Sequence, residues 1–140
     1  MSERFSVIGY GTFITRGYWK DKSNVKVCEV IGFRRIFPEG NWFPYVLPDP
    51  DSSFWALKFD VYRKELIQLD NYEGVPSGLY KRTKPVIKLK DGTKKEAFIY
   101  VPTDQTIQRE NLTLAIDKND RWKQEIRKHP DIVRKFPELE

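Results

Sequence analysis

Apolar positions in the first 62 residues follow the patterns of β-strands. The apolar run 5–8 ends in a glycine-rich stretch, which predicts a first strand over about 4–10 that leads into a turn. Apolar residues alternate with polar ones from Val25 to Phe37, and a change of register at Gly32 predicts a long strand with a β-bulge. Residues 54–62 alternate again and predict a third strand.

The segment 38–55 lies between the second and third predicted strands and has a different character. It holds four prolines and five aromatic residues. Because proline donates no backbone hydrogen bond, we expect no regular element here and predict that the aromatic side chains pack from a loop. This loop is either a lid that excludes water from a pocket or a permanent plug at one end of the fold, and the sequence leaves both open.

The spacing of apolar residues becomes helical after residue 62. Leu66, Leu69 and Tyr72 recur every third position, and Gly74 and Pro76 follow as stop signals, so we predict a short helix that ends at about Glu73.

The remaining residues predict two more strands and a helical tail. Strands over 79–90 and 96–101 are expected to be joined by a tight Asp91-Gly92 hairpin turn. Helices are predicted at about 118–128 and 130–136, within a C-terminal helical extension of about 106–140. Irregular alternation of strands and helices around an antiparallel hairpin favours a single α+β domain over 1–140.

The composition limits the chemistry that this chain can perform. Its 140 residues include one cysteine, Cys28, and one histidine, His129, which excludes an internal disulfide and an ordinary zinc, haem or iron–sulfur site. We interpret these two residues as a half-buried thiol and an exposed imidazole rather than a catalytic pair. The N-terminus lacks the features of a signal peptide and no stretch is long enough to span a bilayer, so we expect a cytoplasmic protein without a membrane partner.

The excess of positive charge behind the formal net charge of +5 is concentrated in residues 79–95. Residues 79–95 contain seven basic side chains and one acidic side chain, whereas the rest of the chain contains 18 basic and 19 acidic ones. Arg82, Lys84, Lys88 and Lys90 alternate with apolar residues, as expected for an exposed strand face. The pattern does not favour nucleic-acid binding by this basic hairpin 79–95, because the stripe is short and few aromatics interrupt it.

Two short motifs carry candidate chemistry. Gly9-Tyr10-Gly11 is no dinucleotide fingerprint, since Ile14 replaces the third glycine; it is either a plain turn or one that presents backbone N–H groups to an anion. Glu73 lies at a predicted helix C-terminus, where the dipole opposes a carboxylate, so it is either a general base with a raised pKa or a solvated glutamate. Asp70 is expected to have a capping or surface role.

The two motifs together resemble the γ-glutamylcyclotransferase-like family. Tyr10-Gly11-Thr12-Phe13 with Arg16-Gly17 resembles its Tyr-Gly-Ser/Thr-Leu/Asn loop, and Leu69-Asp70-x-x-Glu73-Gly74 resembles its Leu-Asp-x-x-Glu-Gly signature. Tyr80-Lys81-Arg82, Asp91-Gly92 and Ala97-x-x-Tyr100-Val101 continue the family order, so the resemblance covers about residues 5–102. Phe13 departs from the family pattern, which usually has Leu or Asn there.

The resemblance implies a fold, an activity and a site. The fold would be a small mixed β-barrel of five to six mostly antiparallel strands with flanking short helices. The activity would be release of 5-oxoproline from a γ-glutamyl amino acid or γ-glutamylamine, without metal or cofactor, by a monomer or homodimer. Glu73 would be the general acid/base, while Tyr10, Gly11, Thr12, Phe13 and Tyr80 would bind the substrate. The alternative is a non-catalytic module on the same fold that binds a small metabolite or a nucleic acid through the basic hairpin 79–95.

Overall fold

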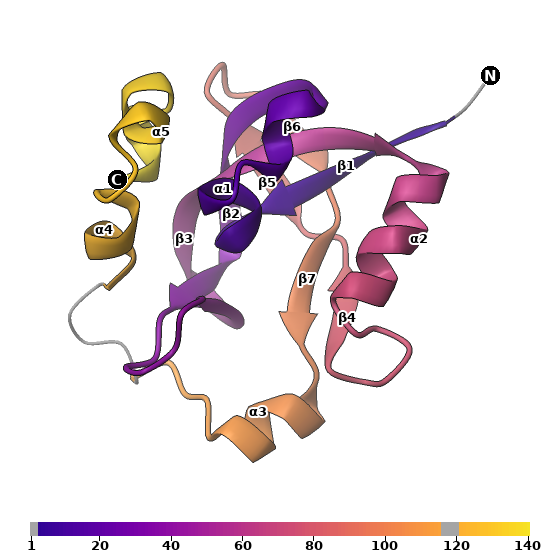
Figure 1. Ribbon diagram of the computed structural model, residues 1–140, viewed down its shortest axis with the longest axis vertical. Coiled ribbons are helices and arrows are strands. Elements are labelled where there is room, and N and C mark those ends of the chain that lie inside the picture. The colour runs from indigo at the N-terminus through magenta and orange to yellow at the C-terminus, as the bar shows by residue number, and fades with distance from the viewer. Residues whose placement is uncertain (1–2, 116–120) are drawn as a thin grey trace.

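The structure is a computed structural model that describes residues 3–115 and 121–140 (Figure 1). Short helices surround a strongly curled sheet. In chain order the elements are β1 (Arg4–Gly9), α1 (Thr12–Thr15), the 3₁₀ turn η1 (Tyr18–Asp21), β2 (Ser23–Ile36), β3 (Tyr45–Tyr62), α2 (Arg63–Tyr72), β4 (Tyr80–Thr83), β5 (Val86–Leu89), β6 (Lys94–Glu96), β7 (Ile99–Pro102), α3 (Asp104–Glu110), α4 (Arg121–Ile126), α5 (Pro130–Lys135) and η2 (Pro137–Leu139).

The main sheet has the order β1-β3-β2-β5-β6, with every pair antiparallel, and β4 pairs with β7 in a second, two-stranded sheet. Phe98, between β6 and β7, brings the chain back to β1. The Ile8 amide donates to the Phe98 carbonyl and the Phe98 amide donates to the Ser6 carbonyl, both at 2.8 Å. This parallel bridge joins the two ends of the curled sheet, and the predicted α+β, mostly antiparallel barrel architecture is confirmed.

The predicted strand 79–90 is wrong as a single strand. Pro85 separates β4 from β5, and the two belong to different sheets, because proline cannot donate to a continuous ladder. The basic hairpin 79–95 is therefore no single hairpin; the Asp91-Gly92 turn joins only β5 and β6. Within residues 3–115 and 121–140 the split brings the strands to seven, more than the five to six expected.

The prediction that all of 38–55 is a loop is also wrong, because β3 begins at Tyr45. Its first half has only β2 as a neighbour, since β1 pairs with residues 57–62. Prolines are tolerated along such an edge. The predicted bulge at Gly32 is confirmed: the register shifts between Ile31 and Phe33, and Gly32 has a φ of 84°. The loop proper is confined to 38–44.

The core joins the barrel to the helices. The predicted helix is confirmed as α2, which buries Leu66 and Leu69 against barrel residues such as Phe59. Helices α4 and α5 add Trp122, Ile126 and Ile132 to the same cluster, on the side of the molecule away from α2 in Figure 1. The first residues of the predicted helix 118–128 lie outside the described residues. Helix α3, capped by Thr103, was not predicted.

No helix among the described residues combines the length and the apolar character that crossing a membrane requires.

Candidate active site

A small cavity of about 40 Å³ lies where β1, the 38–44 loop and the C-terminal end of α2 meet. We call it the Glu73 cavity. It brings together all the residues that the sequence proposes for the site, which are far apart along the chain. Its lining residues are Ile8, Tyr10, Gly11, Thr12, Phe13, Phe43, Pro44, Glu73, Tyr80 and Tyr100.

The end of α2 fixes the position of Glu73. Glu73 is the C-cap residue, and its amide donates to the Leu69 carbonyl at 2.9 Å. The next two amides close a Schellman motif: Gly74 donates to Asn71 at 3.1 Å and Val75 donates to Asp70 at 2.9 Å. Gly74 has a φ of 74°, a conformation that disfavours any residue with a side chain. The helix stop seen in the sequence therefore also places the carboxylate.

Glu73 is half-buried rather than a fully solvated surface residue. Burial raises the pKa of Glu73 to about 7. Within residues 3–115 and 121–140 its carboxylate forms no hydrogen bond or ion pair that would offset this desolvation. A carboxyl group with such a pKa can both accept and return a proton near neutral pH.

The turn at Gly11, which belongs to the Tyr10-Gly11-Thr12-Phe13 motif, forms one wall of the Glu73 cavity. A Cβ atom on Gly11 would lie 2.7 Å from Pro44 Cγ, so glycine is what allows the 38–44 loop to approach this closely. The amides of Thr12 and Phe13 begin α1, and no group in the described part of the chain accepts a hydrogen bond from them. Two N–H donors are therefore available at the edge of the Glu73 cavity.

Three tyrosines, Tyr10, Tyr80 and Tyr100, also line the Glu73 cavity. The Tyr10 hydroxyl donates to the Tyr100 carbonyl at 2.7 Å, and the Tyr80 ring stacks on Tyr45 with centroids 6.1 Å apart. Burial raises the pKa of Tyr10, Tyr80 and Tyr100, with Tyr80 adding to the effect on Tyr10. These phenols therefore stay neutral at physiological pH and serve as polar, uncharged walls.

Asp70 has neither the capping nor the surface role expected from the sequence. Its carboxylate accepts a hydrogen bond from the Tyr100 hydroxyl at 2.7 Å and forms an ion pair with Arg82 at 3.6 Å. Asp70 thus ties α2 to the β4–β7 sheet and holds Tyr100 against the cavity.

Four further residues line the Glu73 cavity and were not proposed from the sequence: Ile8, Phe43, Pro44 and Tyr100. Tyr100 belongs to the Ala97-x-x-Tyr100-Val101 motif of the family resemblance, and this motif could have identified it. Phe43 and Pro44 carried no signal beyond their place in an aromatic loop. Cys28 and His129 lie outside the Glu73 cavity. Cys28 is completely buried rather than half-buried, and desolvation raises its pKa to about 12. His129, which precedes α5, is half-buried rather than exposed.

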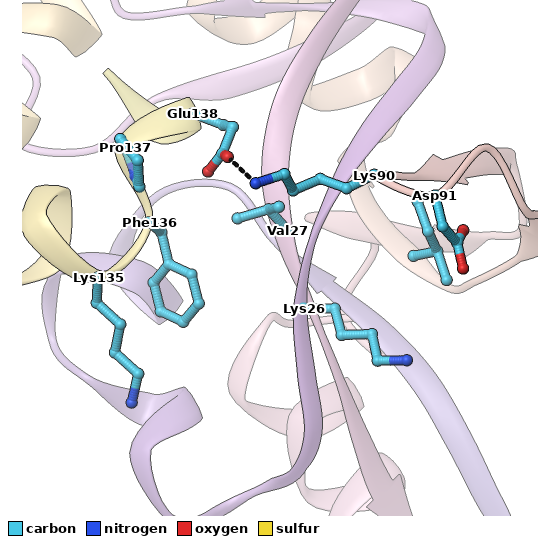
Figure 2. A pocket seen from close by; sticks show the side chains of 9 residues that line it. Lys26, Val27, Lys90, Asp91, Lys135, Phe136, Pro137 and Glu138 are labelled. Carbon is cyan, nitrogen blue, oxygen red and sulfur yellow. Dashed lines mark ion pairs between the residues drawn. The ribbon is translucent and has the colours of Figure 1, made fainter.

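The basic residues of 79–95 are partly engaged within the fold. Figure 2 shows Lys90 reaching across a cavity of about 340 Å³ to Glu138, with Nζ 2.7 Å from Oε1. Arg82 pairs with Asp70 and lies 4.6 Å from the Phe98 ring centroid. The expected exposure of Arg82, Lys84, Lys88 and Lys90 is confirmed. Only Arg82 and Lys88 lie on strands, and these two strands belong to different sheets.

Comparison with known proteins supports the same architecture. Residues 7–124 match the sequence profile of a family described as gamma-glutamyl cyclotransferase, AIG2-like, a stretch that extends beyond the 5–102 expected. No curated protein sequence matches the chain significantly.

Three solved structures illustrate the shared fold. An Arabidopsis thaliana protein is 17% identical and superposes with a TM-score of 0.69, over 99% of this chain and 86% of its own. A structure described as a gamma-glutamyl cyclotransferase is 19% identical, with a TM-score of 0.61 over 95% and 99% of the two chains. A yeast protein, described as a gamma-glutamyl cyclotransferase specific to glutathione, is 13% identical, with a TM-score of 0.60 over 98% and 89%.

Proposed function

The chain belongs to the gamma-glutamyl cyclotransferase, AIG2-like family and is a cyclotransferase-like enzyme, and on that premise we propose that it releases 5-oxoproline from a γ-glutamyl amino acid or γ-glutamylamine, with Glu73 as general acid/base. One observation carries the proposal. A half-buried carboxyl group without a partner among the described residues shares a cavity with the Gly11 turn. A cytoplasmic location and a monomeric or homodimeric state stay predictions from the sequence.

The proposed reaction is an intramolecular acyl transfer. The substrate α-amine attacks the γ-carbonyl carbon, a new C–N bond closes the five-membered ring, and the bond to the leaving amine breaks. Glu73 takes the proton that the attacking nitrogen loses and gives it to the leaving nitrogen, so the carboxylate is regenerated. Holding amine and carbonyl together contributes up to roughly 7–11 kcal/mol, and proton transfer typically contributes about 10²–10⁴-fold.

The cavity walls suit the remaining tasks. The Thr12 and Phe13 amides are donors for the negative charge that develops on the γ-carbonyl oxygen or for the glutamyl carboxylate. Tyr10 and Tyr80 bound the space in which the glutamyl chain must fold. Charge stabilisation and substrate folding are therefore both assigned to groups of this chain.

The test is a panel of γ-glutamyl amino acids, γ-glutamylamines and glutathione, assayed for 5-oxoproline. We expect product from at least one compound, and we expect Glu73→Gln to lower kcat by roughly 10²–10⁴-fold. Glu3→Gln makes the same chemical change at an exposed position and is the matched control. The proposal fails if no compound yields 5-oxoproline or if Glu73→Gln retains full activity.

A further inference from the structure

A second cavity, of about 370 Å³, also borders the Thr12-Phe13 segment. We call it the Tyr72 cavity. It shares Thr12 and Phe13 with the Glu73 cavity, and Tyr72 directly precedes Glu73 along the chain. Its size falls in the range of about 300–1,000 Å³ that is typical of small-molecule sites. Its lining residues are Thr12, Phe13, Arg16, Tyr18, Gln68, Leu69 and Tyr72.

Three of the seven residues that line the Tyr72 cavity are aromatic. The Phe13 ring lies 5.2 Å from Tyr18 and 6.4 Å from Tyr72, in tilted arrangements. Tyr72 is 62% exposed, so a large ring faces open space beside an apolar hollow. A ligand with an apolar or aromatic group would gain by covering these surfaces.

The positively charged side chain of Arg16 also lines the Tyr72 cavity. Arg16 is exposed, and its guanidinium lies 4.8 Å from the Trp42 ring centroid. No carboxylate in residues 3–115 and 121–140 pairs with Arg16. Trp42 in turn contacts Phe43, a wall of the Glu73 cavity, with ring centroids 4.9 Å apart. The Arg16 charge is therefore available to a carboxylate of a ligand that extends from one cavity to the other.

We propose that the Tyr72 cavity binds the leaving amino acid of the substrate, and that the enzyme prefers γ-glutamyl amino acids with a large apolar or aromatic side chain. That side chain packs against Phe13, Tyr18 and Tyr72, and the carboxylate of the leaving amino acid pairs with Arg16. The inference rests on the proposed function, because it assigns the glutamyl part to the Glu73 cavity. A γ-glutamylamine would lack the carboxylate, and a small side chain would leave the aromatic walls uncovered.

The experiment compares three substrates: γ-glutamylphenylalanine, γ-glutamylalanine and γ-glutamylphenethylamine. We expect kcat/KM for the phenylalanine compound to exceed that for the alanine compound by at least about tenfold. The phenethylamine compound has the ring without the carboxylate and should also be slower. These two comparisons separate the apolar contact from the charge.

Two variants test the assigned residues. Tyr72→Ala should bring the phenylalanine-to-alanine ratio of kcat/KM close to one, and Arg16→Gln should narrow the gap between the phenylalanine and phenethylamine compounds. Ile67→Ala is the matched control, because Ile67 is 54% exposed on the same helix and lies outside the Tyr72 cavity; it should leave both ratios unchanged.

The outcomes separate the two proposals. Turnover of the alanine compound at a rate equal to or above that of the phenylalanine compound overturns the substrate preference and leaves the cyclotransferase function standing. A ratio that Tyr72→Ala does not change overturns the assignment of the cavity. Absence of 5-oxoproline from all three compounds overturns the proposed function and this inference together.

Discussion

Glu73 shows how one side chain acquires a useful pKa from its position alone. Burial disfavours the carboxylate form, and no cation in the described part of the chain compensates for it. The cost therefore falls on the stability of the folded protein. The pKa of Glu73 is raised from about 4.5 to about 7, so the folded protein binds this proton more tightly than the unfolded chain does. The resulting contribution to stability is fully present below pH 4.5 and is lost as the pH rises through 7, where the carboxylate form predominates.

The stability of the Glu73→Gln variant should reveal this cost. Glutamine does not ionise, so the free energy of unfolding of the variant relative to the natural chain should increase by roughly 2–3 kcal/mol between pH 4 and pH 8. Chemical denaturation at both pH values measures the difference. A stability difference that is the same at the two pH values would mean that Glu73 titrates normally in the folded state.

At the same scale, the residues proposed from the sequence all line the Glu73 cavity, whereas the contacts around them were not predicted. The unfavourable position of Glu73 against the helix dipole was visible in the spacing of Leu66, Leu69 and Gly74. The contacts of Asp70 were not, because Tyr100 and Arg82 lie on strands whose placement relative to α2 depends on the whole barrel.

At the scale of elements, the 38–44 loop covers the Glu73 cavity. Phe43 and Pro44 line it, and the cavity of about 40 Å³ has room for little more than one water molecule. The proposed binding of a glutamyl group therefore requires the walls of this cavity to move apart. The same cover contributes to the desolvation that sets the pKa of Glu73.

Truncating the cover should change the pH dependence of the reaction. In the natural enzyme kcat/KM should rise with pH through a midpoint near 7, because the base must be ionised. Phe43→Ala admits water to the Glu73 cavity, so the pKa of Glu73 and with it the midpoint should shift to lower pH. The measurement is the pH profile of 5-oxoproline release; an unshifted midpoint would show that the loop does not control this desolvation.

The elements that sequence patterns predicted poorly are those decided by partners distant along the chain. Pro48 and Pro50 argue against a strand, yet β3 accepts them because its first half lacks a second neighbour and its register shifts near the Gly32 bulge. Pro85 had the opposite effect and split a continuous pattern into β4 and β5. By contrast, the Asp91-Gly92 turn and α2 are specified by local residues and were predicted correctly.

At the scale of the whole molecule, the C-terminal segment belongs to the core that supports the site. The Trp122 indole N–H donates to the Leu139 carbonyl at 2.8 Å, and its ring is packed in the cluster that also holds Phe13 and Leu69. Lys90 and Glu138 add a link from the β5–β6 hairpin. The last 20 residues therefore stabilise the barrel from the side away from α2 in Figure 1.

Two tryptophan substitutions should separate buried from exposed packing. Trp122 is 4% exposed, so Trp122→Ala should lower the free energy of unfolding by roughly 3–5 kcal/mol. Trp42 is 61% exposed, and Trp42→Ala should cost less than about 1 kcal/mol. Denaturant unfolding of both variants provides the measurement. Equal losses in the two variants would contradict the assignment of the C-terminal segment to the core.

The seam between β1 and Phe98 gives substrate binding a mechanical role. Ile8 and Tyr10 lie on the β1 side of this seam and Tyr100 lies on the other, and all three line the Glu73 cavity. A bound glutamyl group would contact residues on both sides of this seam and so link them. Any free energy of binding is then also free energy that resists opening of the barrel at this joint.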